Sequence, residues 1–200
     1  MKLANLFLAL AVSGVCAARA EVQIGKPAPE FTAKDINGRT HQLSEYKGKI
    51  VVLEAYNLEC PFCANHFKSG AMQELQGYAA SKSVVWLVIN SVNPKNPGYR
   101  DPADAKKEFQ AQTMKAAAWI DDSSGKIGKA YGLKTTPHMV VIDKNGVVAY
   151  NGAIDDRPSD EGDPRKARNY VREAIDQLSA GEKVKVASTK SYGCGVKYAD

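Results

Sequence analysis

Two cysteines, Cys60 and Cys63, stand three positions apart with a proline and a phenylalanine between them. Thiols at this spacing can form a disulfide with each other, bind a metal ion or fill a hydrophobic core. An apolar run before them predicts a buried strand, and the segment after them predicts a helix that has Pro61 at its first position. The sequence therefore places both thiols at the junction of a strand and a helix.

The two thiols are expected to differ in their chemistry. Cys60 lies at the predicted helix start, where unpaired backbone N–H groups and the positive end of the helix dipole favour thiolate over thiol. Cysteines in such positions have pKa values of about 3.5–7.5. Cys63 lies one turn inside the helix and is expected to be less exposed. We therefore predict that Cys60 exchanges with a partner disulfide and that Cys63 resolves the mixed disulfide.

A metal site and an inert structural bridge are the alternatives for this pair. A structural zinc site needs four ligands, and no second paired motif supplies the other two. A bridge that closes so short a loop restrains the unfolded chain little, so it stabilises the fold little. We therefore expect no metal and no other cofactor, although the chain offers further candidate ligands in Cys194, His41, His66 and His138.

Two residues outside the motif support redox chemistry. Glu54 interrupts the apolar run, and a carboxylate in a buried strand is costly unless it is paired or protonated. A raised pKa would let Glu54 exchange a proton with Cys63; the alternative is that Glu54 faces solvent from an edge strand. Pro137 is expected at the start of a strand, because proline cannot donate within a central ladder. The bond before it can be cis, and the alternative is an ordinary loop proline.

The elements that position these residues follow from hydrophobic periodicity and turn residues. Asn37-Gly38 and Asn145-Gly146 predict the turns of two hairpins, and Gly70 predicts a break in the helix after the cysteines. Strands that alternate with helices and end in a hairpin predict an α/β fold: a mixed central sheet, helices on both faces and an N-terminal β-hairpin extension. The expected strands lie at 49–57, 83–91 and 118–121 and in a hairpin over 137–154, and the expected helices at 61–81, 103–118, 125–132 and 165–181.

The first twenty residues have the pattern of a secretory signal peptide. Lys2 precedes an apolar run, and Ala18 and Ala20 form a small-x-small cleavage site. The run is short for a membrane span, which needs about 20 apolar residues. An uncleaved anchor is the alternative, and a lipoprotein at Cys16 is disfavoured because Val15 precedes that cysteine. We expect cleavage after Ala20, a periplasmic or secreted protein without a membrane span in its mature chain, and a compartment in which disulfides persist.

Charge and the remaining titratable residues indicate little further chemistry. The formal net charge is +5, and the basic residues form no stripe interleaved with aromatic residues, so nucleic acid binding is not predicted. The acidic stretch 155–163 lacks the spacing of a calcium-binding loop and predicts a solvated loop. His66 is expected on a helix surface, and Trp86 and Trp119 are expected in the core.

Taken together, these motifs resemble the thioredoxin superfamily over most of residues 22–180. The resemblance rests on LEAYNLECPFC at a strand–helix junction, on TTPHMVVID downstream and on the Asn-Gly hairpin after it. The opening IGKPAPEFTAKDINGRTHQLSEYKGKIVVL is similar to the alkyl hydroperoxide reductase and thiol-specific antioxidant (redoxin) branch, and the tail STKSYGCGVKY to an exported, peroxiredoxin-like group within it. The resemblance implies a thioredoxin-like fold, with Glu54 in the place of a buried aspartate and Pro137 in that of the cis-proline beside the disulfide.

Three functions follow, of which a thiol–disulfide oxidoreductase acting on protein thiols and disulfides, or on a redox partner protein, is the leading one. A thiol peroxidase with Cys60 as the peroxide-attacking residue is the alternative. Peroxiredoxins, however, have Pro and Thr seven and three positions before that cysteine, whereas Leu53 and Asn57 stand here, so slow or absent peroxidase activity is predicted. The third reading is a non-catalytic binding module that presents residues 93–102 to a partner.

Cys194 is the third cysteine of the expected mature chain, and an odd number leaves at least one thiol free, shared or exchanging. The resemblance implies a resolving or relay thiol, and the alternative is an idle thiol in a floppy tail. We expect a resting Cys60–Cys63 bridge, and a link from Cys194 to Cys60 when Cys63 is replaced by serine. The expected organisation is a signal peptide at 1–20, a redoxin domain at 21–182 and a tail at 183–200.

Overall fold

A computed structural model of the chain describes residues 22–199. The predicted signal peptide, residues 1–20, lies outside this part. Among the helices of the described part, none has the length and apolar character that crossing a membrane requires.

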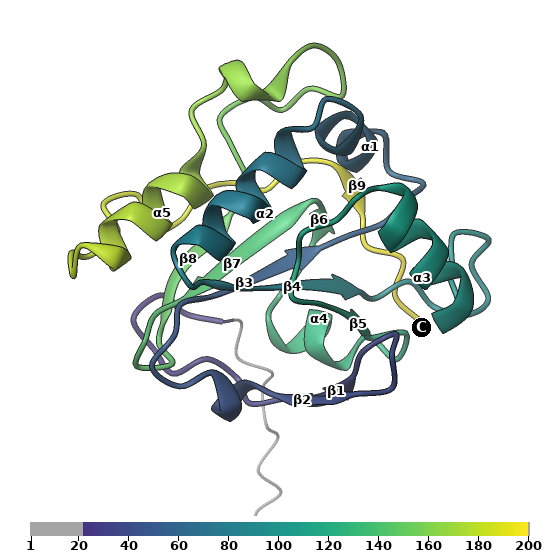
Figure 1. The fold of residues 1–200 in the computed structure, drawn as a ribbon, viewed down its shortest axis with the longest axis horizontal. Coiled ribbons are helices and arrows are strands. Elements are labelled where there is room, and N and C mark those ends of the chain that lie inside the picture. Colours follow the sequence, from purple (N-terminus) through teal and green to yellow (C-terminus); the bar gives the residue numbers. More distant parts are fainter. Residues whose placement is uncertain (1–21, 200) are drawn as a thin grey trace, which may run out of the picture.

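A mixed sheet of five strands, in the order β5-β4-β3-β7-β8, forms the centre of the molecule (Figure 1). The strand that leads to the cysteines, β3, pairs in parallel with β4 and antiparallel with β7, so both of its edges are covered. Every residue of β3, β4 and β7 is buried, as the continuous apolar runs predict. The strands are β3 (Val51–Ala55), β4 (Val85–Asn90), β5 (Ala118–Asp121), β7 (His138–Ile142) and β8 (Val148–Gly152).

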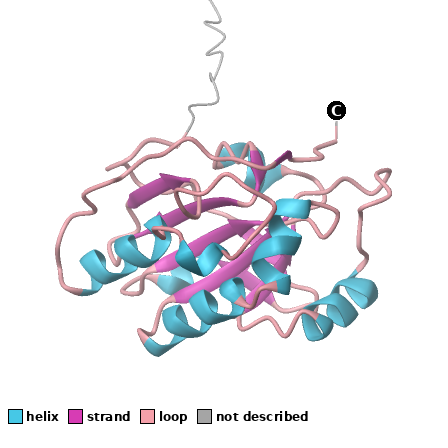
Figure 2. Ribbon diagram, turned by 90° about the horizontal axis from the view of Figure 1, so that it is seen from above, coloured by secondary structure: helices cyan, strands magenta, loops and turns pink. Residues whose placement is uncertain are grey.

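Helices cover both faces of this sheet, as Figure 2 shows. Trp86 and Trp119 form a core on one face with Met72 of α2, which confirms the expectation that both tryptophans are core residues. On the other face Leu53 packs in a second core with Ile127 of α4. The first core receives residues from α1 (Pro61–Lys68), α2 (Ala71–Ser81), α3 (Pro102–Ala111) and α5 (Tyr170–Ser179), and the second from α4 (Lys126–Ala130).

The N-terminal hairpin has the predicted turn. β1 (Thr32–Lys34) pairs antiparallel with β2 (Thr40–Gln42), and Gly38 lies between them with a φ of 81°. A short 3-10 helix (Leu43–Tyr46) then leads towards β3. The hairpin lies on the face of the sheet that α4 also covers, with Leu43 in the same core as Ile127.

The helix boundaries differ from the predicted ones in two places. The helix predicted over 103–118 ends at Ala111, because Thr113 takes a φ of 48° and the chain then runs into β5. The closing helix begins at Tyr170, where the Asn169 side chain accepts the backbone N–H of Arg172 and caps it. A 3-10 turn (Pro164–Lys166) precedes that cap. The predicted break at Gly70 is confirmed, with a φ of 80° between α1 and α2.

The tail packs on the domain. After α5 the chain, yellow in Figure 1, returns across the molecule to β9 (Cys194–Gly195), which pairs antiparallel with β6 (Thr135–Thr136). This strand forms within the Gly-Cys-Gly segment of the tail, residues 193–195. Glycine has no side chain to hinder such a close approach of two backbones. The tail therefore lies beside the strand that precedes Pro137.

Candidate functional site

The structure places Cys60 and Cys63 at the strand–helix junction that the sequence predicts. Cys60 is the N-cap of α1 and Cys63 lies in its first turn. Both are 0% exposed and both are free thiols. The greater exposure expected for Cys60 is therefore wrong, because its sulfur lies under β6 and the tail, 2.8 Å from the carbonyl oxygen of Thr136.

The surroundings of the two thiols move their pKa values in opposite directions. A hydrogen bond from the Cys63 side chain is the largest cause that lowers the pKa of Cys60, to about 4, and it outweighs the opposing effect of burial. Smaller contributions come from the side chains of Thr136 and Cys194 and from the backbone N–H of Cys63. Burial raises the pKa of Cys63 well above its usual value, and the neighbouring Cys60 adds to that. In the reduced pair these surroundings therefore favour the thiolate form of Cys60 and the thiol form of Cys63.

Glu54 is buried in the central strand β3 at 0% exposure, so the alternative of a solvent-facing edge position is wrong. One carboxylate oxygen, Oε2, accepts hydrogen bonds from Trp86 Nε1 at 2.7 Å and Gln76 Nε2 at 3.1 Å. The other oxygen, Oε1, has no hydrogen-bond partner in the described part of the chain. Burial raises the pKa of Glu54 to about 7 against the effect of both bonds, and the Glu54 charge raises the pKa of Cys63.

Pro137 lies where the sequence predicts, between β6 and β7, and the Thr136–Pro137 bond is cis. The strand that Pro137 introduces pairs with β3, with His138 opposite Ala55. This pairing brings the Thr136 carbonyl to the sulfur of Cys60. The structure therefore brings Pro137 and both cysteines to one end of the sheet.

Cys194 lies directly against this pair. It is the residue opposite Thr136 in the β6–β9 pairing, and its thiol hydrogen-bonds to Cys60. Burial, followed by that bond to Cys60, raises the pKa of Cys194 to about 11. The alternative of a floppy tail is wrong for the described residues, and all five candidate site residues are close to one another or, for Glu54, linked electrostatically to Cys63.

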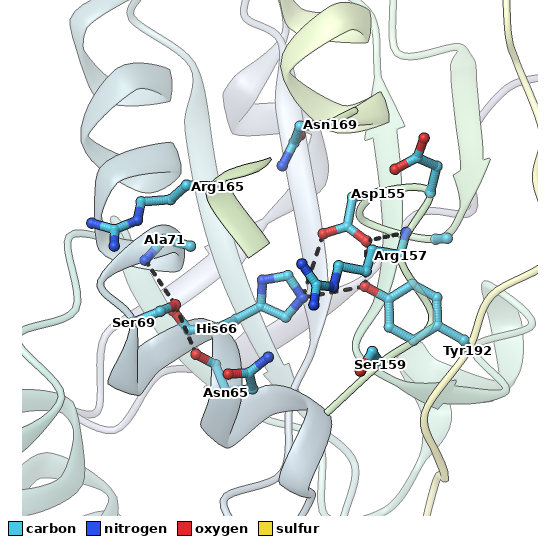
Figure 3. A network of polar contacts seen from close by, with 12 residues as sticks. Asn65, His66, Ser69, Ala71, Asp155, Arg157, Ser159, Arg165, Asn169 and Tyr192 are labelled. Atoms are coloured by element: carbon cyan, nitrogen blue, oxygen red, sulfur yellow. Dashed lines mark hydrogen bonds and ion pairs between the residues drawn. The ribbon is translucent and has the colours of Figure 1, made fainter. Parts of the chain in front are cut away.

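A buried polar cluster that the sequence did not predict joins α1 to the tail (Figure 3). The Tyr192 hydroxyl donates to Asp155 Oδ1 at 2.6 Å and lies 3.2 Å from His66 Nε2. The second oxygen, Asp155 Oδ2, is 3.7 Å from the same ring nitrogen. Because the hydroxyl proton points to Asp155, the imidazole N–H can donate to the Tyr192 oxygen.

This cluster corrects two expectations. His66 was expected on a helix surface and Asp155 in a solvated loop, yet each is 2% exposed. Burial lowers the pKa of His66 to about 4 and raises that of Asp155. The one residue in the sequence that could have indicated this cluster is Tyr192, two residues before Cys194. A buried tyrosine hydroxyl needs a polar partner, but the sequence alone does not identify that partner. The Tyr192 ring also lies against Phe62 of the motif, with 5.8 Å between ring centroids.

The two positions that distinguish the chain from peroxiredoxins are both buried. Leu53 of β3 packs in the core on the face of the sheet that α4 covers. The Asn57 side-chain oxygen accepts the backbone N–H of Glu59 at 3.0 Å. Neither position carries the hydroxyl that the peroxiredoxin pattern places near the reactive cysteine. Within residues 22–199, no group of three or more His, Cys, Asp or Glu side chains is arranged to hold a metal ion.

A family model described as the AhpC/TSA family matches residues 24–151. Among curated proteins, the chain is 30% identical over 127 residues to the thiol-disulfide oxidoreductase ResA of Geobacillus thermodenitrificans, covering 64% of this chain and 67% of the relative. It is 31% identical over 138 residues to the chloroplastic peroxiredoxin Q of Oryza sativa subsp. japonica, covering 65% of this chain and 58% of the relative. Thiol–disulfide oxidoreductases and peroxiredoxins are thus both among the similar proteins.

Solved structures share the fold at lower identity. An uncharacterized conserved protein from Geobacillus kaustophilus has a TM-score of 0.78 at 24% identity, covering 88% of this chain and 93% of that chain. The exposed lipoprotein thioredoxin Etrx1 of Streptococcus pneumoniae strain TIGR4 has a TM-score of 0.53 at 24% identity, covering 75% of this chain and all of that one. These likenesses confirm a thioredoxin-like fold.

Proposed function

The chain belongs to the AhpC/TSA family, and from that premise we propose that it is an exported thiol–disulfide oxidoreductase whose redox pair is Cys60 and Cys63. The likeness to ResA supports a redox enzyme at the general level. The observation that carries the more specific proposal is the asymmetry of the pair. Cys60 is held as a thiolate at the start of α1, while burial keeps its neighbour Cys63 protonated.

Thiol–disulfide exchange at this pair proceeds in two displacements. In one direction, the Cys60 thiolate attacks a sulfur of a partner disulfide, a bond forms between Cys60 and that sulfur, and the second partner sulfur leaves as a thiolate. Cys63 then loses its proton and attacks Cys60, which releases the first partner sulfur and leaves a Cys60–Cys63 disulfide. The pair gives the partner two electrons and the proton of Cys63, and the partner takes its second proton from solvent, because Cys60 starts as a thiolate; the reverse direction uses the same steps.

Glu54 supplies or accepts the proton of Cys63 in this scheme. A carboxyl with a pKa of about 7 is present in both protonation states near neutral pH, which suits a general acid–base. Its free oxygen Oε1 is available to hold that proton, since the hydrogen bonds from Trp86 and Gln76 both go to Oε2. Pro137 has a positioning role: it ends β6 and thereby places the Thr136 carbonyl beside Cys60.

Export is part of the proposal. We infer that residues 1–20 are a signal peptide cut after Ala20, that residues 21–182 form the redox domain, and that residues 183–200 form the tail that carries Cys194. The likeness to ResA and to an exposed lipoprotein thioredoxin supports a location outside the cytoplasm. The periplasm or the extracellular space would let the Cys60–Cys63 disulfide persist.

One preparation tests the function. The reduction potential of the purified mature protein is measured in a glutathione redox buffer, and the same sample is assayed with hydrogen peroxide. We expect a reversible Cys60–Cys63 couple that Cys60→Ser and Cys63→Ser each abolish, and slow reaction with peroxide because Leu53 and Asn57 replace the peroxiredoxin residues.

The two alternatives predict different results in the same experiment. The likeness to peroxiredoxin Q favours a thiol peroxidase, which would react with peroxide far faster than free cysteine does. A binding module that presents residues 93–102 would keep an active-site disulfide that resists reduction. Either result would replace the oxidoreductase proposal.

A further inference from the structure

The tail determines which of the three cysteine thiols is accessible from solvent. Cys60 and Cys63 are each 0% exposed, whereas Cys194 is only partly buried. Of the three thiols in the described part of the chain, Cys194 is therefore the one that a molecule in solution can reach without movement of the tail. Cys194 lies opposite Thr136 in the β6–β9 pairing, and the Thr136 carbonyl oxygen is 2.8 Å from the Cys60 sulfur, so the partly buried Cys194 and the buried Cys60 are neighbours.

The tail is anchored on both sides of Cys194. Upstream, Tyr192 is bound to Asp155 and His66 in the buried cluster of Figure 3. Downstream, the backbone N–H of Asn93 donates to the Lys197 carbonyl at 2.8 Å. The chain continues with further anchors: Asn93 Nδ2 donates to the carbonyls of Lys197 and Tyr198 at 3.0 Å each, and the Tyr198 hydroxyl donates to the Leu133 carbonyl at 2.7 Å.

Two glycines make room for this arrangement. A Cβ at Gly193, whose φ is 118°, would overlap the Thr136 carbonyl, so only glycine lets the tail approach β6 this closely. A Cβ at Gly128 in α4 would meet the Tyr198 ring at 2.7 Å and Ser91 Oγ at 2.6 Å. Gly128 in the domain and Gly193 in the tail thus both leave the space that the docked tail needs. The docked tail holds Cys194 beside Cys60.

We propose that Cys194 is a third catalytic thiol, through which thiols and disulfides in solution exchange with the buried Cys60–Cys63 pair. The inference rests on the proposed function, because it requires that pair to be redox-active. It changes one step of that function: the external partner meets Cys194, and Cys60 exchanges with Cys194 instead of with the partner directly. The partners it fits are small thiols, or cysteines on mobile peptide segments, that can reach a sulfur lying at the surface between β6 and the tail.

The steps balance for an external thiol R–SH. Cys194 loses its proton and attacks Cys60, so a Cys60–Cys194 disulfide forms while the Cys60–Cys63 bond breaks and Cys63 takes up a proton. The first R–SH loses its proton to solvent and its thiolate attacks the Cys194 sulfur, so a Cys194–S–R bond forms and Cys60 leaves as a thiolate. A second R–SH releases R–S–S–R and restores the Cys194 thiol. Two external thiols are oxidised, and the Cys60–Cys63 disulfide is reduced.

The electrostatics of the site support this order of attack. In a Cys60–Cys194 disulfide the incoming thiolate can displace either sulfur, and the thiol with the lower pKa leaves faster. The pKa of Cys60 is lowered to about 4 while that of Cys194 is raised to about 11, so Cys60 is the better leaving group. Attack therefore occurs at Cys194, which is also the least buried of the three cysteines in the described part of the chain.

The test follows reduction of the Cys60–Cys63 disulfide by reduced glutathione in the full-length mature protein. We expect Cys194→Ser to slow this reduction by at least about tenfold, since the buried disulfide then becomes accessible only when the tail opens. Gly193→Val in the Cys194→Ser background should restore the rate, because the added side chain overlaps the Thr136 carbonyl and moves the tail off Cys60. An unchanged rate in Cys194→Ser, or no restoration by Gly193→Val, overturns the inference.

A second measurement separates a chemical role for Cys194 from a merely structural one. Oxidised Cys63→Ser protein should carry a Cys60–Cys194 bridge in peptide maps. Cys194 found free, with Cys60 oxidised or paired between molecules, overturns the inference while leaving the proposed function standing. A wild-type protein that forms no Cys60–Cys63 disulfide in a glutathione buffer overturns both.

Discussion

At the residue scale, the site is a set of neighbouring acids that hold their protons with different strength. Cys60 is a thiolate, whereas burial favours the protonated forms of Cys63, Cys194 and Glu54. The buried site thereby carries one negative charge, which hydrogen bonds from the neighbouring side chains stabilise. A second negative charge beside it is disfavoured. Exchange moves this charge from sulfur to sulfur, so residues that set the pKa values also set the rates.

The thiolate of Cys60 is directly observable. We expect the ultraviolet thiolate absorbance of the reduced protein to titrate with a midpoint near pH 4, because hydrogen bonds from Cys63 outweigh burial in setting the pKa of Cys60. The Cys60→Ser variant should lose this transition, and Cys194→Ser, the matched control, should keep it. A reduced wild-type protein whose first thiol titrates near the usual cysteine pKa would contradict the assignment.

Glu54 should impose a pH dependence of its own. Its folded-state pKa of about 7 lies above the ordinary 4.5, so its contribution to stability is fully present below the ordinary pKa and is lost as pH rises through about 7. Glu54→Gln should therefore flatten the fall in the free energy of unfolding between about pH 4.5 and 7, the two pKa values, measured by urea denaturation. It should also slow exchange near neutral pH by removing the acid–base group of Cys63.

The exposed Glu182→Gln is the matched control for Glu54→Gln and should change neither profile. A wild-type protein whose stability does not fall across this range would show that Glu54 is ionised in the folded state.

At the element scale, each working residue is held where one element meets another. β3 ends at Ala55 and residues 56–59 lead from it to Cys60, which caps the start of α1, and β6 ends at Thr136, whose carbonyl lies beside the Cys60 sulfur. The fourth element, β9, adds Cys194 to the free edge of β6. An edge strand with unpaired backbone groups readily accepts another strand. Here the chain's own tail fills that edge, so the site contains a third sulfur that comes from far along the sequence.

Tyr192 is the side chain by which α1 and the tail are joined. Tyr192→Phe removes the hydroxyl that donates to Asp155 Oδ1, so that this buried oxygen keeps only the hydrogen bond from the backbone N–H of Arg157. Loss of a hydrogen bond to a charged, buried group costs about 1–3 kcal/mol, so we expect a fall of that size in the free energy of unfolding by urea. Tyr78→Phe is the matched control, because Tyr78 donates to Asp176 at the exposed surface, where about 0.5 kcal/mol or less is expected.

A second readout places this effect in the tail. If Tyr192 holds the tail in place, Tyr192→Phe should also increase amide hydrogen exchange in residues 190–198 more than in the central sheet. Equal exchange in both variants would show that the tail is held by its other anchors.

At the scale of the whole molecule, local patterns predicted most of the fold and only part of the site. The apolar runs of β3 and β4, the Asn-Gly hairpins and the break at Gly70 were predictable, because short-range periodicity and turn chemistry determine them. The cluster of His66, Asp155 and Tyr192 was not, since it joins three segments whose proximity only the tertiary structure creates. Cys194 was predictable in part. That it is a cysteine indicated redox chemistry, but its position beside Cys60 depends on the docking of the tail, which the sequence did not predict.

The charge of Cys60 should be visible in the stability of the whole protein. Its folded-state pKa is about 4, below the ordinary 9.0, so the stabilisation of the reduced protein is complete above the ordinary pKa and is lost as pH falls through about 4. In the disulfide form Cys60 has no proton to exchange and contributes no such dependence.

We therefore expect the free energy of unfolding of the reduced protein, minus that of the oxidised protein, to rise steadily between about pH 5 and 8. Urea denaturation of both forms across this range measures the difference, and the free energy of unfolding of reduced Cys60→Ser, which forms no Cys60–Cys63 disulfide, should lack the rise that Cys60 gives the reduced wild type. Because a redox couple is more oxidising when its reduced form is the more stabilised one, the same rise would identify the Cys60–Cys63 disulfide as an oxidant of external thiols. A difference that is flat or falls with pH would mean that the fold does not favour the thiolate, and the Cys60–Cys63 disulfide would then lack this drive to accept electrons.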